Sequence, residues 1–170
     1  MNKITPRDIR EITLLSIEEA EKVPQELRML EENGYLCWWW LRSPGYDSRH
    51  AASVNRDSSV YYNGDHVGTV DICVRPALKT ENLSFDLKKF EKAKMFGHTW
   101  TAVTKDLVLC DDSLGKMAFR KDYDTPNANN YEKSDIKAWL GDWLEGQPEM
   151  KDYRAELRAL HARVEAMWRD

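Results

Sequence analysis

Two apolar stretches decide the fold of this chain: Cys37-Trp38-Trp39-Trp40-Leu41-Arg42-Ser43-Pro44-Gly45 and Ile72-Cys73-Val74-Arg75-Pro76-Ala77-Leu78. Each is a short run of aromatic or β-branched residues that ends at Pro or Gly, which is typical of a buried strand. Because successive side chains on a strand point to opposite faces, Trp38 and Trp40 should share one face and Trp39 should occupy the other. We therefore expect both faces to be covered and the two stretches to lie side by side in one sheet.

Each stretch also carries one arginine near its end, Arg42 in the first and Arg75 in the second. A buried arginine is costly unless its N–H groups are satisfied. We therefore expect each guanidinium to cap backbone carbonyl groups or to meet a carboxylate.

The segment between the two stretches is polar. Residues 50–55 and 59–62 predict a hairpin, with Asn63-Gly64 at its second turn. Its composition resembles that of a protein-binding surface, in which Tyr supplies rigid contact area and small polar residues supply adaptable hydrogen bonds. The predicted binding residues are Tyr46, Asp47, Arg49, His50, Asn55, Arg56, Asp57, Tyr61, Tyr62, Asn63, Asp65 and His66. The alternative is an ordinary polar hairpin, since several of these residue types also favour turns.

The motif pair Trp39–Gly45 and Val74–Leu78, with the polar hairpin region between them, resembles the DUF6273 family. The resemblance implies an α+β, C-type-lectin-like fold with a mixed or antiparallel sheet and two flanking helices. Formylglycine-generating enzymes and the variable proteins of diversity-generating retroelements share this fold. In those variable proteins the corresponding hairpin region displays the ligand-contacting residues. A fold of this kind implies no single function.

The flanking sequence predicts further elements. A strand is expected over 11–15, then a helix over 17–31 with a Ser16/Glu19 capping box, a kink or break at Pro24 and a stop at Asn33-Gly34. Strands are expected over 96–103, 106–110 and 116–120, and a loop over 123–131. A helix from Ser134 to Gly146 should bury four residues, Ile136, Trp139, Leu140 and Trp143.

The order of these elements differs from the usual family arrangement, in which the segments matching Phe96–Trp100 and Tyr131–Leu140 come first. The resemblance therefore implies that residues 1–146 are a circularly permuted domain, joined near residues 79–94. The alternative is that the downstream half is an unrelated second unit.

Residues 147–170 predict an added amphipathic helix that begins at Pro148. Its apolar residues are spaced three and four apart, as in a narrow coiled-coil seam: Met150, Tyr153, Leu157, Leu160, Val164 and Met167. This helix is expected either to dock on its own domain or to pair with a second copy, giving a homodimer, or with a partner protein.

Composition limits the possible roles. The chain has 170 residues, a net charge of −4 and three cysteines at scattered positions. The charge argues against general nucleic-acid binding, and the odd cysteine count does not indicate a disulfide framework. The N-terminus lacks an apolar signal core and no window is long enough to span a membrane, so we expect a cytoplasmic protein of a bacterium or a phage-infected cell.

Known chemical motifs give little guidance. We identify no Gly-rich phosphate loop and no close Cys or His pair, so no catalytic residue, metal or cofactor is predicted. The first hypothesis is a non-catalytic protein-binding module, one version being a phage- or mobile-element-encoded inhibitor of a host defence protein, such as an anti-CRISPR. The second is an oxidoreductase of the formylglycine-generating type, in which Cys37 and Cys73 meet in space and use a metal. The third is an oligomerising structural protein built on the C-terminal seam.

Overall fold

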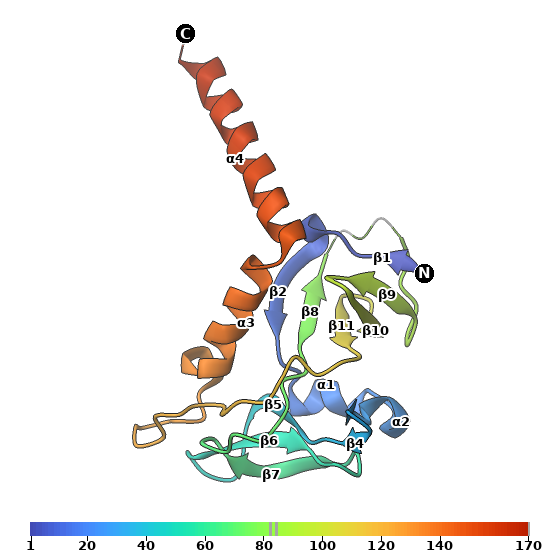
Figure 1. Cartoon of the computed structure of the whole chain (residues 1–170), viewed down its shortest axis with the longest axis vertical. Helices are drawn as coiled ribbons and strands as arrows, with labels where there is room; N and C mark the ends of the chain where they lie inside the picture. Colours follow the sequence, from blue (N-terminus) through green and yellow to red (C-terminus); the bar gives the residue numbers. More distant parts are fainter. Residues whose placement is uncertain (82, 84, 170) are drawn as a thin grey trace.

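A six-stranded mixed sheet and a three-stranded antiparallel sheet form the body of the protein (Figure 1). The computed structural model describes residues 1–81, 83 and 85–169. In spatial order, the six-stranded sheet consists of β1 (Asn2–Lys3), β9 (Lys92–Met95), β10 (His98–Thr104), β11 (Leu107–Cys110), β8 (Ala77–Thr80) and β2 (Ile9–Thr13). The mixed α+β class expected from the sequence is confirmed.

The smaller sheet contains β5 (Trp39–Pro44), β6 (His50–Val54) and β7 (Val60–His66). A two-stranded hairpin, β3 (Glu31–Glu32) and β4 (Tyr35–Leu36), precedes it. The helices are α1 (Ile17–Glu21), α2 (Gln25–Arg28), α3 (Asp135–Glu145) and α4 (Pro148–Trp168), with single 3-10 turns at Pro6–Asp8 and Tyr131–Lys133. No helix among the described residues is both long and apolar enough to cross a membrane.

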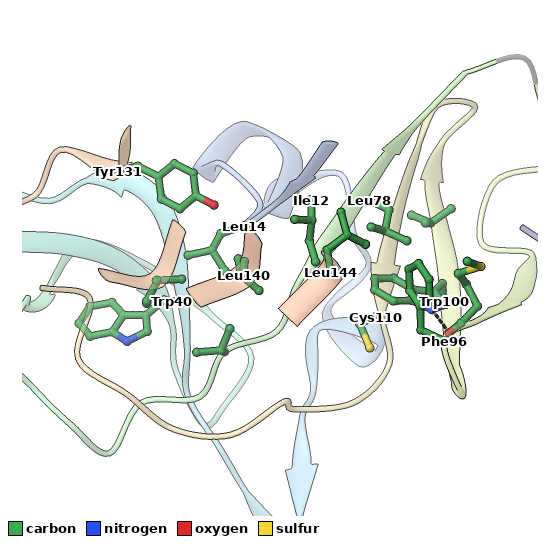
Figure 2. Packing of buried hydrophobic residues seen from close by; sticks show 14 of the residues in the cluster. Ile12, Leu14, Trp40, Leu78, Phe96, Trp100, Cys110, Tyr131, Leu140 and Leu144 are labelled. Carbon is green, nitrogen blue, oxygen red and sulfur yellow. Dashed lines mark hydrogen bonds between the residues drawn. The ribbon is translucent and has the colours of Figure 1, made fainter. Parts of the chain in front are cut away.

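Two buried clusters cover the two faces of the large sheet. On one face, Leu140 and Leu144 of α3 share a buried cluster with Ile12, Leu14 and Leu78 (Figure 2), and this cluster extends to Trp40. The other cluster contains apolar residues of α1, β5 and β11, and Trp39 is one of its members. Trp38 packs against the first cluster, so the predicted alternation of the three tryptophans is confirmed.

Both arginines are satisfied as predicted. Arg75 is buried and donates from Nε to the Cys110 carbonyl (2.6 Å) and from its two Nη atoms to the Leu27 and Arg28 carbonyls (3.1 and 3.3 Å). It therefore caps the C-terminal end of α2 with hydrogen bonds to carbonyl groups alone. Burial lowers the pKa of Arg75 to about 10, which still leaves it charged at neutral pH.

The two motif stretches do not form one sheet, and this prediction was wrong. β5 belongs to the three-stranded sheet, whereas the second stretch enters the six-stranded sheet only at β8. They meet at a single point, where Cys73 N–H donates to the Trp38 carbonyl (3.0 Å) and Trp40 N–H donates to the Cys73 carbonyl (3.1 Å). Pairing does not continue beyond this point, because the next N–H group on this edge of β5, that of Arg42, donates to the Leu15 carbonyl (2.8 Å).

The helix predicted over 17–31 breaks at Pro24 as expected, but it ends at Arg28. Residues 31–36 are a hairpin with Asn33-Gly34 at its turn, so these two residues are not a helix stop. Both adopt positive φ angles, which an Asn-Gly turn between antiparallel strands favours.

Three other local predictions were also wrong. Asn63-Gly64 lies inside β7 at a shift in register and is not a turn. Residues 116–120 contribute only an isolated bridge at Lys116. Trp139 is exposed on α3, and Leu144 takes the buried position instead. The strand pair over 96–110 and the loop over 123–131 are confirmed.

The Ser16/Glu19 capping box also connects α1 to β5 through a hydrogen bond with Arg42. The Glu19 carboxylate accepts hydrogen bonds from Ser16 N–H (2.9 Å) and from Arg42 Nη1 (2.5 Å), and the same Arg42 atom donates to the Leu14 carbonyl (2.6 Å). Burial opposes ionisation of Glu19, but these hydrogen bonds and the charge of Arg42 outweigh it and lower the pKa of Glu19.

A Glu19→Gln substitution should destabilise the fold by about 1–2 kcal/mol at neutral pH, because it removes a charged hydrogen-bond acceptor. The lowered pKa means that the carboxylate stabilises the fold above its unfolded-state pKa of about 4.3 and loses this effect as the pH falls through the folded value. Urea unfolding from pH 7 to pH 3 should show the difference from wild type shrinking below about pH 4. Glu18→Gln, at an exposed neighbouring position, is the control. Equal effects of the two variants would contradict this role.

Candidate functional site

Most of the predicted binding residues lie at one or the other end of β6. Tyr46, Asp47, Arg49, His50 and His66 gather at the end where β6 begins. The turn that follows β6 lies at the other end and carries Asn55, Arg56 and Asp57. A five-residue strand separates these groups by roughly 15 Å, so they do not form one continuous site.

The first group forms a row of four aromatic rings, which we call the aromatic surface: Tyr46, His50, His66 and Tyr123. Neighbouring ring centroids lie 4.4 Å apart for Tyr46 and His50, 5.7 Å for His50 and His66, and 4.7 Å for His66 and Tyr123. Tyr46 is 66% exposed and Tyr123 is 40% exposed. Aromatic pairs at these spacings attract one another, so the row is a defined surface.

Hydrogen bonds hold this surface in place. Asp47 Oδ1 lies 2.6 Å from His50 Nδ1 and accepts from Arg49 N–H, and both contacts lower the pKa of Asp47. Asn129 donates to the carbonyl groups of Asp47 (2.9 Å) and His50 (3.1 Å). Arg49 pairs with Asp124 at 2.9 Å. The loop over 121–130 is thereby fastened to the segment between β5 and β6.

Sequence reasoning missed the contribution of this loop. Asp124 and Asn129 lie more than 70 residues from the partners that they contact, and Tyr123 lies 57 residues after His66. Their only local signal is an Asp-, Asn- and Pro-rich composition, which is equally typical of any solvated loop.

The remaining predicted residues have local partners. Tyr62 donates its hydroxyl hydrogen to Glu21 of α1 (2.9 Å), and Asp65 accepts from the buried Ser53 hydroxyl (2.6 Å). Tyr61 is exposed on β7, and the Asn63 carbonyl accepts from Tyr46 N–H. The side chains of Asn55 and Asp57 contact Ser59 within their own turn, and the Arg56 guanidinium lies 4.5 Å from the Trp38 ring centroid.

A second cluster contains Glu32, Cys37 and Cys73, which we call the thiol cluster; their donor atoms all lie within 4.8 Å of one another. Glu32 Oε2 is 3.9 Å from Cys37 Sγ and 3.4 Å from Cys73 Sγ. The cluster borders a cavity of about 700 Å³ lined by residues that include Glu32, Cys37, Arg56 and Asp71. The expectation that Cys37 and Cys73 meet in space is therefore confirmed, although no sequence pattern predicts that Glu32 joins them.

Cys73 and Cys110 are buried, and as free thiols they are weak nucleophiles. Burial raises the pKa of Cys73 to about 12, and burial likewise raises the pKa of Cys110 to about 12. Nucleophilic chemistry requires a thiolate, so neither group is activated for it in this state. A further donor group, His98, Cys110 and Asp112, lies beside α3 and is held by a His98–Asp112 contact of 2.8 Å.

The comparisons with known proteins give one finding. The sequence model of the family described as "Domain of unknown function (DUF6273)" matches residues 10–81, from β2 to the end of β8. This supports a relationship to that family over the segment that carries both motif stretches and the hairpin region. No curated protein and no solved structure matches the chain.

Gly64 lies in β7 two residues before His66, the residue that β7 contributes to the aromatic surface. Its φ is +77°, and a Cβ there would lie 2.1 Å from the Ala51 carbonyl oxygen. This close approach occurs at the register shift between β6 and β7, just before His66. The position therefore requires glycine both for its backbone angle and for space.

Gly64→Ala should destabilise the protein by more than about 2 kcal/mol, because strain and backbone overlap act together. Gly97→Ala is the matched control: Gly97 has φ +75°, but no atom lies within 4 Å of the added Cβ. This variant should lose only about 1 kcal/mol. Thermal and urea unfolding of both variants measure the difference. Similar losses would show that the close approach to Ala51 does not matter.

Proposed function

We propose that the protein is a non-catalytic protein-binding module whose recognition site is the aromatic surface. The observation that carries the proposal is the row Tyr46, His50, His66 and Tyr123, contributed by three separate segments and fixed by Asp47 and Asn129. Exposed aromatic side chains that are already held in position bind proteins at low entropic cost.

The proposal includes the fold. We infer that residues 1–146 are a permuted C-type-lectin-like domain. The adjacency of its two ends supports this inference: Thr5–Arg7 line a cavity of about 320 Å³ together with Glu149, Asp152 and Tyr153 at the base of α4. Permutation requires chain ends that lie close together at the surface. The new join would fall between β8 and β9, within the range 79–94, although residues 82 and 84 lie outside the described part of the chain.

The net charge of the chain indicates which class of partner it would bind. The chain carries 29 acidic and 25 basic residues, and its net charge of −4 favours association with a basic protein surface. A nucleic-acid-binding defence protein of a host cell is one partner of that kind, so an inhibitor of such a protein is the version of this function that we favour.

Tyr46→Ala and Tyr123→Ala should each weaken binding to the partner at least tenfold, because they remove the two most exposed rings, one from each end of the row. The partner is first captured from lysate of the natural host with the wild-type chain and then purified for affinity measurement. Tyr35→Ala, at an exposed tyrosine of the β3–β4 hairpin, is the control and should bind as wild type does. Unchanged affinity in the first two variants, with an intact circular dichroism spectrum, would refute the site.

A second candidate function, self-association, is favoured by the position of α4. This helix leaves the body as an isolated rod (Figure 1). Met150 in its first turn is buried, and Arg154 pairs with Glu145 of α3 at 2.9 Å, but every described residue from Arg158 to Arg169 is exposed. The alternative that the helix docks along its own domain is therefore wrong beyond its first turns.

We propose that a second copy covers this helix in an antiparallel arrangement. The apolar seam continues into solvent, where Leu160, Val164 and Met167 are 46%, 43% and 78% exposed. In an antiparallel pair centred between Leu157 and Leu160, Glu156 of each copy lies near Arg163 of the other. Met167 then reaches the base of the other copy's helix, where the cavity beside Tyr153 can receive it.

Val164→Glu should convert the dimer to a monomer, because it places two unpaired carboxylates in the apolar seam. Ala162→Glu alters an exposed residue on the opposite side of the helix and should leave the dimer intact. Light scattering after size-exclusion chromatography of the full chain gives the mass of each. A monomeric wild type across the micromolar range would rule out this function.

A further inference from the structure

The thiol cluster has the composition of a metal site. A thiolate pair with one carboxylate suits zinc, which binds Cys sulfur at about 2.3 Å and carboxylate oxygen at about 2.0–2.2 Å in tetrahedral geometry. At a tetrahedral angle, those bond lengths place a sulfur and an oxygen ligand about 3.6 Å apart. The two observed separations, 3.4 Å from Glu32 Oε2 to Cys73 Sγ and 3.9 Å to Cys37 Sγ, lie on either side of that value.

The backbone around the cluster is fixed independently of any ion. Cys73 is held by its two hydrogen bonds with Trp38 and Trp40, and Cys37 N–H donates to the Leu30 carbonyl (2.8 Å). Glu32 lies on β3 opposite Tyr35 in the hairpin. The three donors therefore come from elements that are already paired, which reduces the ordering cost of binding an ion.

Charge and access also agree with a metal. Two thiolates, one carboxylate and a divalent ion leave one net negative charge, and Lys116 Nζ lies 3.9 Å from Glu32 Oε2. Cys73 is fully buried, whereas Glu32 and Cys37 line the cavity of about 700 Å³. An ion bound by the three side chains would thus keep its fourth position toward this cavity, as in zinc sites with three protein ligands.

We propose that Glu32, Cys37 and Cys73 bind one zinc ion, with the fourth coordination position open to the neighbouring cavity. Binding displaces one proton from each thiol to solvent and forms two Zn–S bonds and one Zn–O bond, with no change of oxidation state. This site is separate from the aromatic surface, and the proposed protein-binding function does not require it.

The test is titration of the full-length chain, purified with reductant and without chelator, with Zn²⁺ and with Co²⁺ as a spectroscopic probe. Wild type should bind one equivalent, and the Co²⁺ form should show a thiolate charge-transfer band and the intense visible bands of a tetrahedral ion. Cys37→Ser should abolish the charge-transfer band or reduce it by about half, and Glu32→Gln should weaken Zn²⁺ binding at least tenfold. Glu31→Gln, at the exposed neighbouring position, should bind as wild type does.

Cys110→Ala separates this site from the other donor group, which contains His98 and Asp112. It should leave zinc stoichiometry and the charge-transfer band unchanged. The proposal is overturned if wild type takes up no zinc at micromolar concentration, or if folded Cys37→Ser and Glu32→Gln variants bind as tightly as wild type.

Discussion

The pair of backbone hydrogen bonds between Cys73 and the tryptophan strand is the constraint on which the other parts depend. It is the point where the chain, after leaving the three-stranded sheet, touches β5 before it enters the six-stranded sheet as β8. Just beyond it, Arg75 ties β11 to the end of α2 and lies 4.8 Å from the Trp39 ring centroid. Trp39 in turn donates from its indole to the Arg28 carbonyl. One short segment thereby sets the relative position of both sheets and of the broken helix.

The same junction explains why the thiol cluster exists. Cys37 comes just before β5 and Cys73 is the residue that bonds to it, so the backbone pairing that joins the sheets also brings the two sulfur atoms together. The β3–β4 hairpin, which replaces the expected end of a helix, places Glu32 against them. The backbone hydrogen bonds that join the two sheets therefore also position the thiol cluster.

Much of this arrangement could be predicted from local pattern. Alternation along a strand placed the three tryptophans, desolvation predicted the carbonyl contacts of Arg42 and Arg75, and the capping box located the start of α1. The sequence did not predict that the segment after Cys73 joins the six-stranded sheet as β8, because strand pairing depends on distant partners. Asn63-Gly64 predicts a turn, but the same dipeptide also suits a bulge, which is what it forms inside β7. Tyr123 and Glu32 reach their clusters only through tertiary contacts, which no local pattern encodes.

The direction of α4 has a consequence for assembly. The helix rises about 1.5 Å per residue, so its exposed part from Arg158 to Trp168 extends about 15 Å beyond the body. Figure 1 places this rod and the three-stranded sheet at opposite ends of the longest axis. A molecule seated on one end therefore leaves the other sterically accessible. A dimer formed through α4 would carry its two three-stranded sheets at opposite ends, pointing away from each other. Such a dimer has the geometry to hold two partner molecules at once, at a separation set by the length of α4.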